Sequence, residues 1–535
     1  MNYIQGIDRQ QSTAFPMTLE EYVSSENPVR FLDAFVNALN LRELGFTHTV
    51  LAATGRSPFH PGDLLKLYLY GYLHGTRSSR KLEHLTKCNV EVMWLLGYLQ
   101  PDHWVVSNFR KDNIGSLKKV CKTFTLFCKE LDLLGGESIG VDGSKFGAVN
   151  HSSRCYSKKK IEKMLTSIDE KIAKYFADLD SEDKNEESDI VTNDISLKEK
   201  IARMVQEKER LERLQREMEE AGETQIALTD PDSRFMRAST GRGDISYNVQ
   251  IAVDDKHKLI VAYDATNSMN DLNELSNIAM QAKEILGSEE LEALTDMGYF
   301  NGPEIKKCHD EKITCTMPRP KRSNNKKRGL YTIDDFQYDA TQDCYRCPAG
   351  EILTHRGKRT KNGRVENIYL SDACQACLQR SKCTRSKGKG RLIARWEHEH
   401  LIEEMQERLR KDPKKMRKRG GLVEHPFGTM KCTMNQRYFL LKGKHKVNGE
   451  MGLTVLAYNI KRVLNILGVK RLLEMVEEKL KNPSFSCSFF VEYYFWRHIL
   501  CEVGHWRFLD HYGLENSSVM RKVNYFGKRR YERAA

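Results

Sequence analysis

The chain has 535 residues, which is too many for one hydrophobic core and predicts three or four domains at roughly one per 150 residues. Its hydrophobic fraction of 40% and charged fraction of 30% are ordinary for a soluble globular protein, and its net charge of +13 favours a polyanionic partner. Residues 1–16 contain no apolar signal-peptide core, and no run of about 18 apolar residues occurs. We therefore expect no membrane span and a cytoplasmic, nucleoid-associated protein. Nucleic acid is the expected polyanionic partner, and a membrane surface is the alternative.

Residues 1–135 are expected to form a helical N-terminal DNA-binding domain. Apolar residues recur at helical spacing from Leu64 to Leu73, after a helix start at Pro61-Gly62-Asp63. Basic residues such as Arg77 and Arg110 stand between the apolar ones. Two interpretations stay open: a helical bundle with a solvated basic face, or a module related to the helix-turn-helix.

The pattern changes from helix to strand at Ser138. A short strand is expected to end on Asp142, and a later one leads to Asp296. Alternating strands and helices of this kind predict a catalytic α/β domain with a mixed sheet, beginning with residues 136–320. The expected elements are strands at 138–142, 248–253, 259–263 and 291–295, and a helix at 272–286.

A highly charged insertion, 156–225, interrupts these strands. Apolar stripes at helical spacing flank an acidic segment, 178–194, which we expect to be a loop. The pattern predicts an antiparallel helical hairpin. A structural arm and a role in dimerisation or DNA contact are equally compatible with it.

Five of the 14 cysteines fall within residues 325–395. Two CxxC pairs separated by 26 residues are typical of a structural Zn²⁺ site, because each pair presents two thiolates to one ion. The region is therefore expected to be a zinc-ribbon-like insertion; unmetallated thiols are the alternative. The candidate ligands are Cys344, Cys347, Cys374, Cys377 and Cys383.

Three acidic residues stand out by their context. Asp142 and Asp296 follow predicted strands, and Glu424 precedes a helix predicted to start near Phe427. Phosphodiester chemistry uses carboxylates to hold two Mg²⁺ ions roughly 4 Å apart. Taken singly, each residue is more often a turn residue, so the prediction depends on all three converging.

The order of these motifs resembles that of the bacterial insertion-sequence DDE transposases. The matching segments are 102–103 and 109–110, 139–144 (IGVDGS), 230–235 (DPDSRF), 247–254 (YNVQIAVD), 295–300 (TDMGYF), the cysteines, and 424–431 (EHPFGTMK). The resemblance implies a ribonuclease-H-like catalytic domain and a triad of Asp142, Asp296 and Glu424 that binds Mg²⁺ or Mn²⁺. It further implies cleavage of transposon ends in double-stranded DNA, strand transfer into target DNA, and a homodimer or higher oligomer in the active complex.

The resemblance also implies that Lys431 contacts a DNA phosphate. The related pattern has a tyrosine and an arginine before the glutamate; here Arg417 and Arg419 are available, but no tyrosine is. Two other functions stay open: a non-catalytic zinc-containing DNA-binding regulator, and a nuclease of the same fold without strand transfer.

A basic run precedes Glu424, in a segment (396–470) expected to complete the catalytic domain. Eight positive charges fall within twelve residues there, and we expect the run to bind the DNA backbone. A solvated surface is the alternative. The C-terminal segment, residues 471–535, is rich in aromatic and basic residues, and the sequence indicates no function for it. The candidate DNA contacts are Lys414, Lys415, Arg417, Lys418, Arg419 and Lys431.

Overall fold

The computed structural model describes residues 18–481, apart from 52, 53, 55, 56, 183–190, 238–242, 321–323, 362 and 387–389. The larger of two compact units holds Asn40–Leu467 and the chain up to Ser24, and the smaller holds Ser25–Leu39 and the chain from Gly468. The smaller unit contains α1 (Pro28–Asn37). Most of the C-terminal segment 471–535, from residue 482 on, lies outside the described residues.

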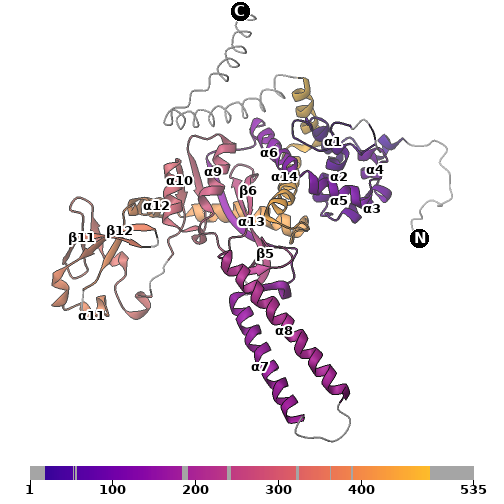
Figure 1. Ribbon diagram of the computed structural model, residues 1–535. Helices are drawn as coiled ribbons and strands as arrows, with labels where there is room; N and C mark the ends of the chain where they lie inside the picture. Colours follow the sequence, from indigo (N-terminus) through magenta and orange to yellow (C-terminus); the bar gives the residue numbers. More distant parts are fainter. Residues whose placement is uncertain are drawn as a thin grey trace, which may run out of the picture. The chain divides into compact units, whose positions relative to one another are not determined.

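Helices make up the N-terminal part of the larger unit (Figure 1). The predicted helix start is confirmed: α2 begins at Pro61, and the His60 side chain accepts a hydrogen bond from the Gly62 amide. This helix is buried on all sides, including Leu67 and Tyr68 at 0% exposure, so it forms the centre of the helical region. The helices and the 3₁₀ turn are η1 (Leu19–Tyr22), α2 (Pro61–Leu73), α3 (Ser79–Cys88), α4 (Val90–Leu96), α5 (His103–Asp112) and α6 (Ile114–Glu130).

A buried ion pair joins this helical region to the distant C-terminal part of the same unit. Arg77, 5% exposed, lies 3.1 Å from Glu450, which is fully buried. The guanidinium also donates to the carbonyl oxygens of Asn435 and Tyr438. The Glu450 carboxylate accepts from the amides of Leu440 and Leu441. Both charges are thereby hydrogen-bonded, as burial requires.

The predicted mixed sheet is confirmed as a six-stranded sheet with β1 in its interior. The strand order is β4–β5–β1–β7–β8, and β6 pairs with another stretch of β5. β1 is antiparallel to β5 and parallel to β7, which is parallel to β8. The strands are β1 (Ser138–Gly147), β4 (Arg234–Arg237), β5 (Gly243–Asp254), β6 (Ile260–Thr266), β7 (Leu291–Leu294) and β8 (Ile313–Thr316). Helices α9 (Leu275–Leu286) and α10 (Gly302–Asp310) accompany them.

The strand expected to end on Asp142 is longer than predicted. β1 runs on to Gly147, so Asp142 lies in its middle. It continues because β5 pairs with it along almost its whole length, from Ile139 opposite Asp254 to Gly147 opposite Ser246. The exchange of backbone hydrogen bonds with β5 outweighs the local turn signal of the Asp-Gly-Ser sequence.

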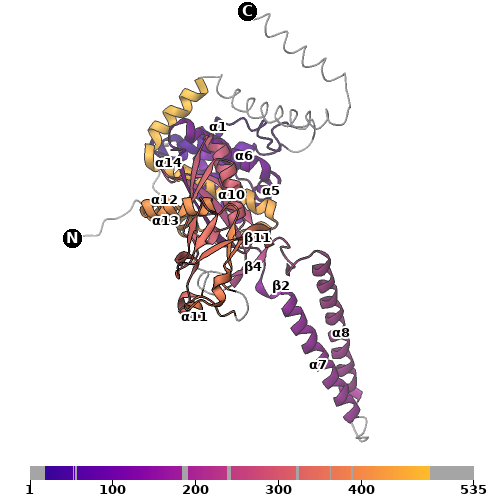
Figure 2. The same ribbon diagram turned by 90° about the vertical axis from the view of Figure 1, so that its left-hand side faces the viewer.

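The insertion forms two long antiparallel helices, α7 (Lys158–Glu182) and α8 (Val191–Glu220). They lie side by side in two views at right angles (Figures 1 and 2). The expected acidic loop is shorter than predicted, because helix continues to Glu182 and resumes at Val191. At the base, β2 (Cys155–Ser157) pairs with β3 (Gln225–Ala227), and a small core surrounds Ile161 and Leu211.

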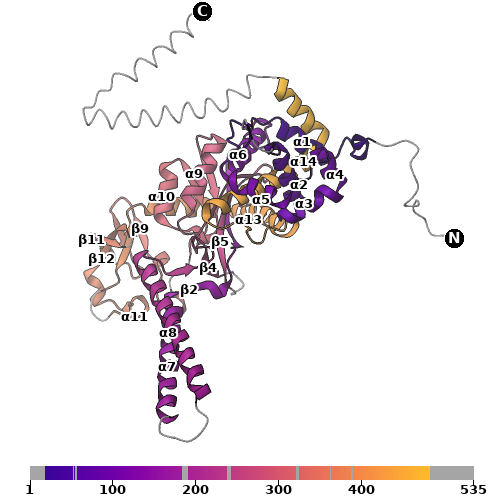
Figure 3. The same ribbon diagram turned by 45° about the vertical axis from the view of Figure 1, so that its right-hand side comes forward.

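The cysteine-rich region folds as its own antiparallel sheet (Figure 3). Its strand order is β13–β12–β11–β10–β9, around a core that includes Tyr345, Leu353 and Tyr369. The strands are β9 (Gln337–Asp339), β10 (Cys344–Arg346), β11 (Ile352–Lys361), β12 (Arg364–Leu370) and β13 (Ile393–Trp396), with a short α11 (Arg380–Cys383). Three 3₁₀ turns accompany them: η4 (Lys326–Arg328), η5 (Ile333–Asp335) and η6 (Asp372–Gln375).

Three helices follow: α12 (Glu399–Lys411), α13 (Lys414–Gly428) and α14 (Lys444–Lys481). The position of Glu424 differs from the prediction, because the helix begins at Lys414 and includes the glutamate in its last turns. Pro426 lies inside the helix, and a π-helical turn (Thr429–Thr433) follows it. α14 is interrupted at Gly468, whose φ of 75° is left-handed. Within the described residues, no helix is long and apolar enough to cross a membrane.

We expect Gly140→Ala to destabilise the protein by about 1–3 kcal/mol, because α13 packs directly on β1 at this glycine. A Cβ at Gly140 would come within 3.0 Å of Val423 Cγ1 and 3.1 Å of Leu422 Cβ. The control is Gly115→Ala in helix α6, where a Cβ meets nothing within 4 Å. Urea unfolding monitored by circular dichroism compares them; equal stability of the two variants would contradict the close packing.

Candidate active site

Two of the predicted acidic residues, Asp142 and Asp296, are brought to the same edge of the sheet. Asp142 lies on β1, and Asp296 follows β7, the parallel neighbour that pairs Leu294 with Gly140. Arg419 of α13 bridges the two carboxylates: its Nη2 atom lies 2.6 Å from Asp142 Oδ1 and 4.0 Å from Asp296 Oδ2. A residue predicted as a DNA contact therefore pairs with both aspartates.

A third aspartate, Asp271, joins this site and was missed by the sequence analysis. A Cβ built at Gly143 would lie 2.4 Å from Asp271 Oδ1, and one built at Gly298 would lie 3.7 Å from Asp271 Oδ2. Gly143 directly follows Asp142, and Gly298 lies two residues beyond Asp296. The absence of side chains there lets the Asp271 carboxylate enter the site. The available signal was an acidic residue between a strand and a helix.

Buried amides hold Asp271 in place. Its Oδ1 atom accepts hydrogen bonds from Asn248 Nδ2 at 2.8 Å and from Gln250 Nε2 at 2.7 Å. Tyr299, three residues beyond Asp296, donates its hydroxyl proton to the other side of the Gln250 amide. Asn248 and Gln250 lie on β5, at 2% and 1% exposure. This buried hydrogen-bond network therefore holds the Asp271 carboxylate in place.

The electrostatics of the site disfavour negative charge on Asp142. Burial raises the pKa of Asp142 to about 6, the Arg419 guanidinium opposes this, and the Asp296 and Asp271 carboxylates reinforce it. Burial also raises the pKa of Tyr299, and the same three aspartates add to that effect. Positive charge beside these carboxylates favours their ionised forms.

Lys431 contacts the part of β1 that follows Asp142. Its Nζ atom donates to Ser144 Oγ at 2.6 Å and to the Lys145 carbonyl oxygen at 3.0 Å, and it lies 4.6 Å from the Phe146 ring centroid. Burial lowers the pKa of Lys431, and the nearby Asp142 raises it. Ser144 is two residues from Asp142, so this ammonium group borders the site.

Glu424, the third predicted residue, is exposed on α13. Its Oε1 atom is directed back along the helix, 3.6 Å from a Cβ built at Gly420. Among the described residues, no group of three or more His, Cys, Asp or Glu side chains is arranged to hold a metal ion. Of the three predicted acidic residues, Asp142 and Asp296 are thus both within 4.0 Å of Arg419, and Glu424 lies on the same helix as that arginine.

The basic run before Glu424 is partly engaged in ion pairs within the protein. Lys415 lies 2.6 Å from Glu292, and Lys418 lies 2.6 Å from Asp255. Lys414 and Arg417 are exposed, and the described part of the chain offers them no ion-pair partner. These two residues are consequently the ones most accessible to an external anion.

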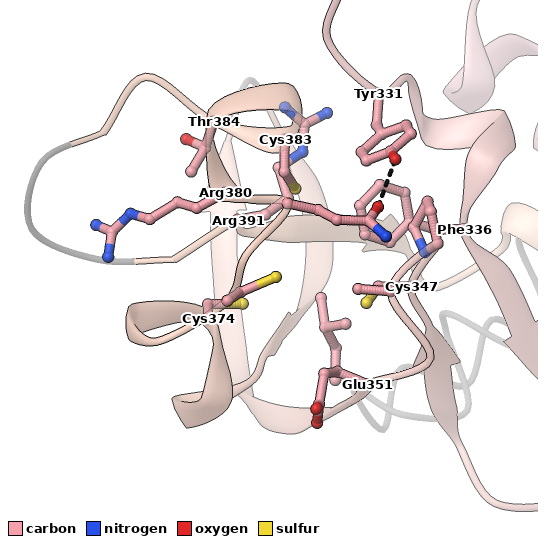
Figure 4. Close-up of a pocket in the computed structure, with 14 residues that line it drawn as sticks. Tyr331, Phe336, Cys347, Glu351, Cys374, Arg380, Cys383, Thr384 and Arg391 are labelled. Atoms are coloured by element: carbon pink, nitrogen blue, oxygen red, sulfur yellow. Dashed lines mark hydrogen bonds between the residues drawn. The ribbon is translucent and has the colours of Figure 1, made fainter.

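Four of the five clustered cysteines line one small cavity of about 20 Å³. Figure 4 shows Cys347, Cys374 and Cys383, which come from separate segments around it. Cys377 is the fourth, whereas Cys344 lies on β10, where its thiol faces Gln342. Burial raises the pKa of Cys383, Arg391 lowers it, and the other three cysteines of the cavity raise it further. The described cysteines are free thiols.

Two transposase families match this sequence. Residues 346–464 match the family described as "Transposase DDE domain", and residues 17–112 match "Transposase domain (DUF772)". Glu424 and Lys431 lie within the first match. No curated protein matches the chain.

Among solved structures, a piggyBac transposase synaptic complex with hairpin DNA is similar at 9% identity, over 86% of this chain and 83% of that chain. The TM-score is 0.32.

We expect the metal-free protein to lose stability relative to Asp142→Asn as the pH rises from about 4 to about 6. The raised pKa means that the folded state holds a proton on Asp142 that the unfolded state has already released, so this stabilisation is present at low pH and lost above the window. The shift from 3.8 to about 6 corresponds to about 3 kcal/mol.

Denaturant unfolding in EDTA, at several pH values across the window, measures the difference between the two proteins. Adding Mg²⁺ should restore wild-type stability at neutral pH, since a bound cation favours the ionised carboxylate. A difference that is independent of pH would show that Asp142 titrates normally.

Proposed function

The chain belongs to the insertion-sequence DDE transposases, and we propose that it uses Asp142, Asp296 and Glu424 to cut transposon ends and transfer the strands into target DNA. One observation carries the proposal: Asp142 and Asp296 lie on neighbouring parallel strands, and one arginine contacts both carboxylates. A ribonuclease-H-like catalytic domain agrees with the strand order.

The aspartates are suited to hold Mg²⁺ or Mn²⁺, because they offer hard oxygen ligands that burial and mutual repulsion leave in need of positive charge. When bound, such ions activate the attacking oxygen and stabilise the leaving one. The protein supplies the positions. β1 and β7 fix the two carboxylates, and the Asn248 and Gln250 amides fix Asp271 behind them.

Two residues are candidates for the third carboxylate. Glu424 is an exposed residue of α13, five positions beyond Arg419, which is about 7.5 Å further along the helix and about 140° around its axis. Asp271 already faces Asp142 and Asp296. We assign the ligand role to Glu424, which lies within the matched DDE family, and a supporting role to Asp271.

Positive side chains border the carboxylates and are suited to bind the DNA strand. Arg419 neutralises Asp142 in the absence of metal, and Lys431 is held at Ser144 beside it. Phosphate contacts of this kind position a strand without reading its sequence. Exposed Lys414 and Arg417 extend the positive surface along α13.

We predict that Asp142→Asn, Asp296→Asn and Glu424→Gln each abolish cleavage of element-end DNA while leaving DNA binding intact. Each loses a metal ligand without losing volume. Asp271→Asn should reduce cleavage only partly, because the amide can still occupy the polar network. Gel-based cleavage and strand-transfer assays with Mg²⁺ measure both steps; Asp112→Asn, an exposed acidic residue of α5, is the control.

Wild-type cleavage by any of the three variants would remove that residue from the triad. If Asp271→Asn is inactive and Glu424→Gln is active, the third ligand is Asp271. Cleavage by the wild-type protein without joining would identify a nuclease rather than a transposase.

We also propose that Cys347, Cys374, Cys377 and Cys383 bind one structural Zn²⁺. Their four thiols line one cavity, whose other walls include Phe336 and Leu353, and four thiolates around one point suit a tetrahedral Zn²⁺. Cys344 is left out, because its side chain does not line the cavity. The site would join the segment after β10 to α11 and so stabilise an otherwise small sheet.

Cys383→Ser should lower the zinc content of the purified protein well below one ion per chain, whereas Cys344→Ser should leave it unchanged. Mass spectrometric metal analysis measures this. The Cys383→Ser protein should also be cut faster by protease within 325–395, because metal binding contributes folding energy. Equal zinc loss in both variants would return Cys344 to the ligand set.

A further inference from the structure

The positive charge of the protein is concentrated in the cysteine-rich region. Residues 325–395 contain 16 basic and 7 acidic residues, whereas the remainder of the chain contains 70 and 66. A region of this length therefore carries most of the net charge of +13. Charge this unevenly distributed marks the surface that meets a polyanion.

Part of this charge borders a hollow beside the candidate active site. The hollow lies between the β11–β12 hairpin and the chain around the starts of α9 and α10. Lys361 and Arg364 line it from the hairpin, Lys307 from α10, and Asn273 and Asn301 from the two loops. Asn273 is two residues beyond Asp271, and Asn301 is five residues beyond Asp296.

The hairpin is held against the catalytic sheet's helices at this point. Arg364 donates to Asn301 Oδ1 at 2.9 Å, and Asn301 Nδ2 donates to Asn273 Oδ1 at 2.7 Å. Gly302 permits the close approach, because a Cβ there would lie 3.3 Å from the Arg364 guanidinium carbon and 3.2 Å from the Trp396 ring. The polar lining is therefore fixed relative to the loops that carry Asp271 and Asp296.

The acidic residues of the hollow are neutralised by their own partners. Glu304 lies 2.9 Å from Lys307, and Glu366 lies 2.8 Å from Arg359. Lys361 is exposed, and no described acidic side chain pairs with it. The hollow thus offers uncompensated positive charge together with an amide donor on Asn273.

We propose that this hollow binds the backbone phosphates that flank the scissile phosphate on the substrate DNA strand. The cysteine-rich region would then guide that strand into the active site. The inference rests on the proposed function and adds a binding surface to it. Ammonium, guanidinium and amide donors around an open hollow suit phosphodiester oxygens and recognise no particular base.

Lys361→Ala tests the proposal, with Lys327→Ala as the matched control. Both lysines are exposed and lie in 325–395, and each substitution removes one positive charge. Only Lys361 lines the hollow. Binding to an element-end duplex is measured in EDTA by fluorescence anisotropy over a range of salt concentrations. Lys361→Ala should weaken binding about threefold or more and reduce the salt slope by about 0.9, as expected for one lost phosphate contact.

Single methylphosphonate substitutions, which neutralise one phosphate at a time, locate the contact. The wild-type protein should lose affinity at one or two positions flanking the cut, and Lys361→Ala should be insensitive at those positions. Lys361→Arg should restore binding.

Equal affinity and equal salt slopes for Lys361→Ala and Lys327→Ala would overturn the inference. So would methylphosphonate sensitivity that is the same in Lys361→Ala as in the wild type. A wild-type protein that binds no DNA would contradict the proposed function instead, and the two failures are therefore distinguishable.

Discussion

The candidate site depends on the pairing of β1 with a strand on each side. Antiparallel pairing with β5 carries β1 past Asp142, and parallel pairing with β7 delivers Asp296 to the same edge. The same register sets Gln250 opposite Gly143, where the amide can hold Asp271. A slip of one residue in β1 would turn Asp142 to the other face and remove it from this group.

Much of this arrangement was predictable from the sequence, because it follows from local pattern. The strands around Asp142 and Asp296, strands β5 and β6, the two arm helices and the start of α2 are all encoded by apolar spacing and turn residues. The spacing of apolar residues does not indicate at which residue a strand stops pairing with its neighbour or a helix begins. β1 is therefore longer than its apolar segment, and α13 begins well before the apolar residues that follow Glu424.

What the sequence could not provide are contacts between distant segments. Asp271 has no motif of its own, and its place in the site depends on the missing side chains of Gly143 and Gly298. Likewise Cys344 belongs to a regular CxxC pair, yet strand pairing in β10 turns it away from the cavity that Cys347 lines. The pairing of Arg419 with Asp142, across 277 residues of chain, is also a tertiary result.

The Arg77–Glu450 ion pair has a consequence for synthesis of the protein on the ribosome. The two residues are separated by 373 positions, so at 5–20 residues per second Glu450 is made about 20–75 seconds after Arg77. Until then the guanidinium has neither its carboxylate nor the carbonyl groups of Asn435 and Tyr438, and burying it alone is unfavourable. The N-terminal helices therefore complete their packing only after most of the chain has been translated.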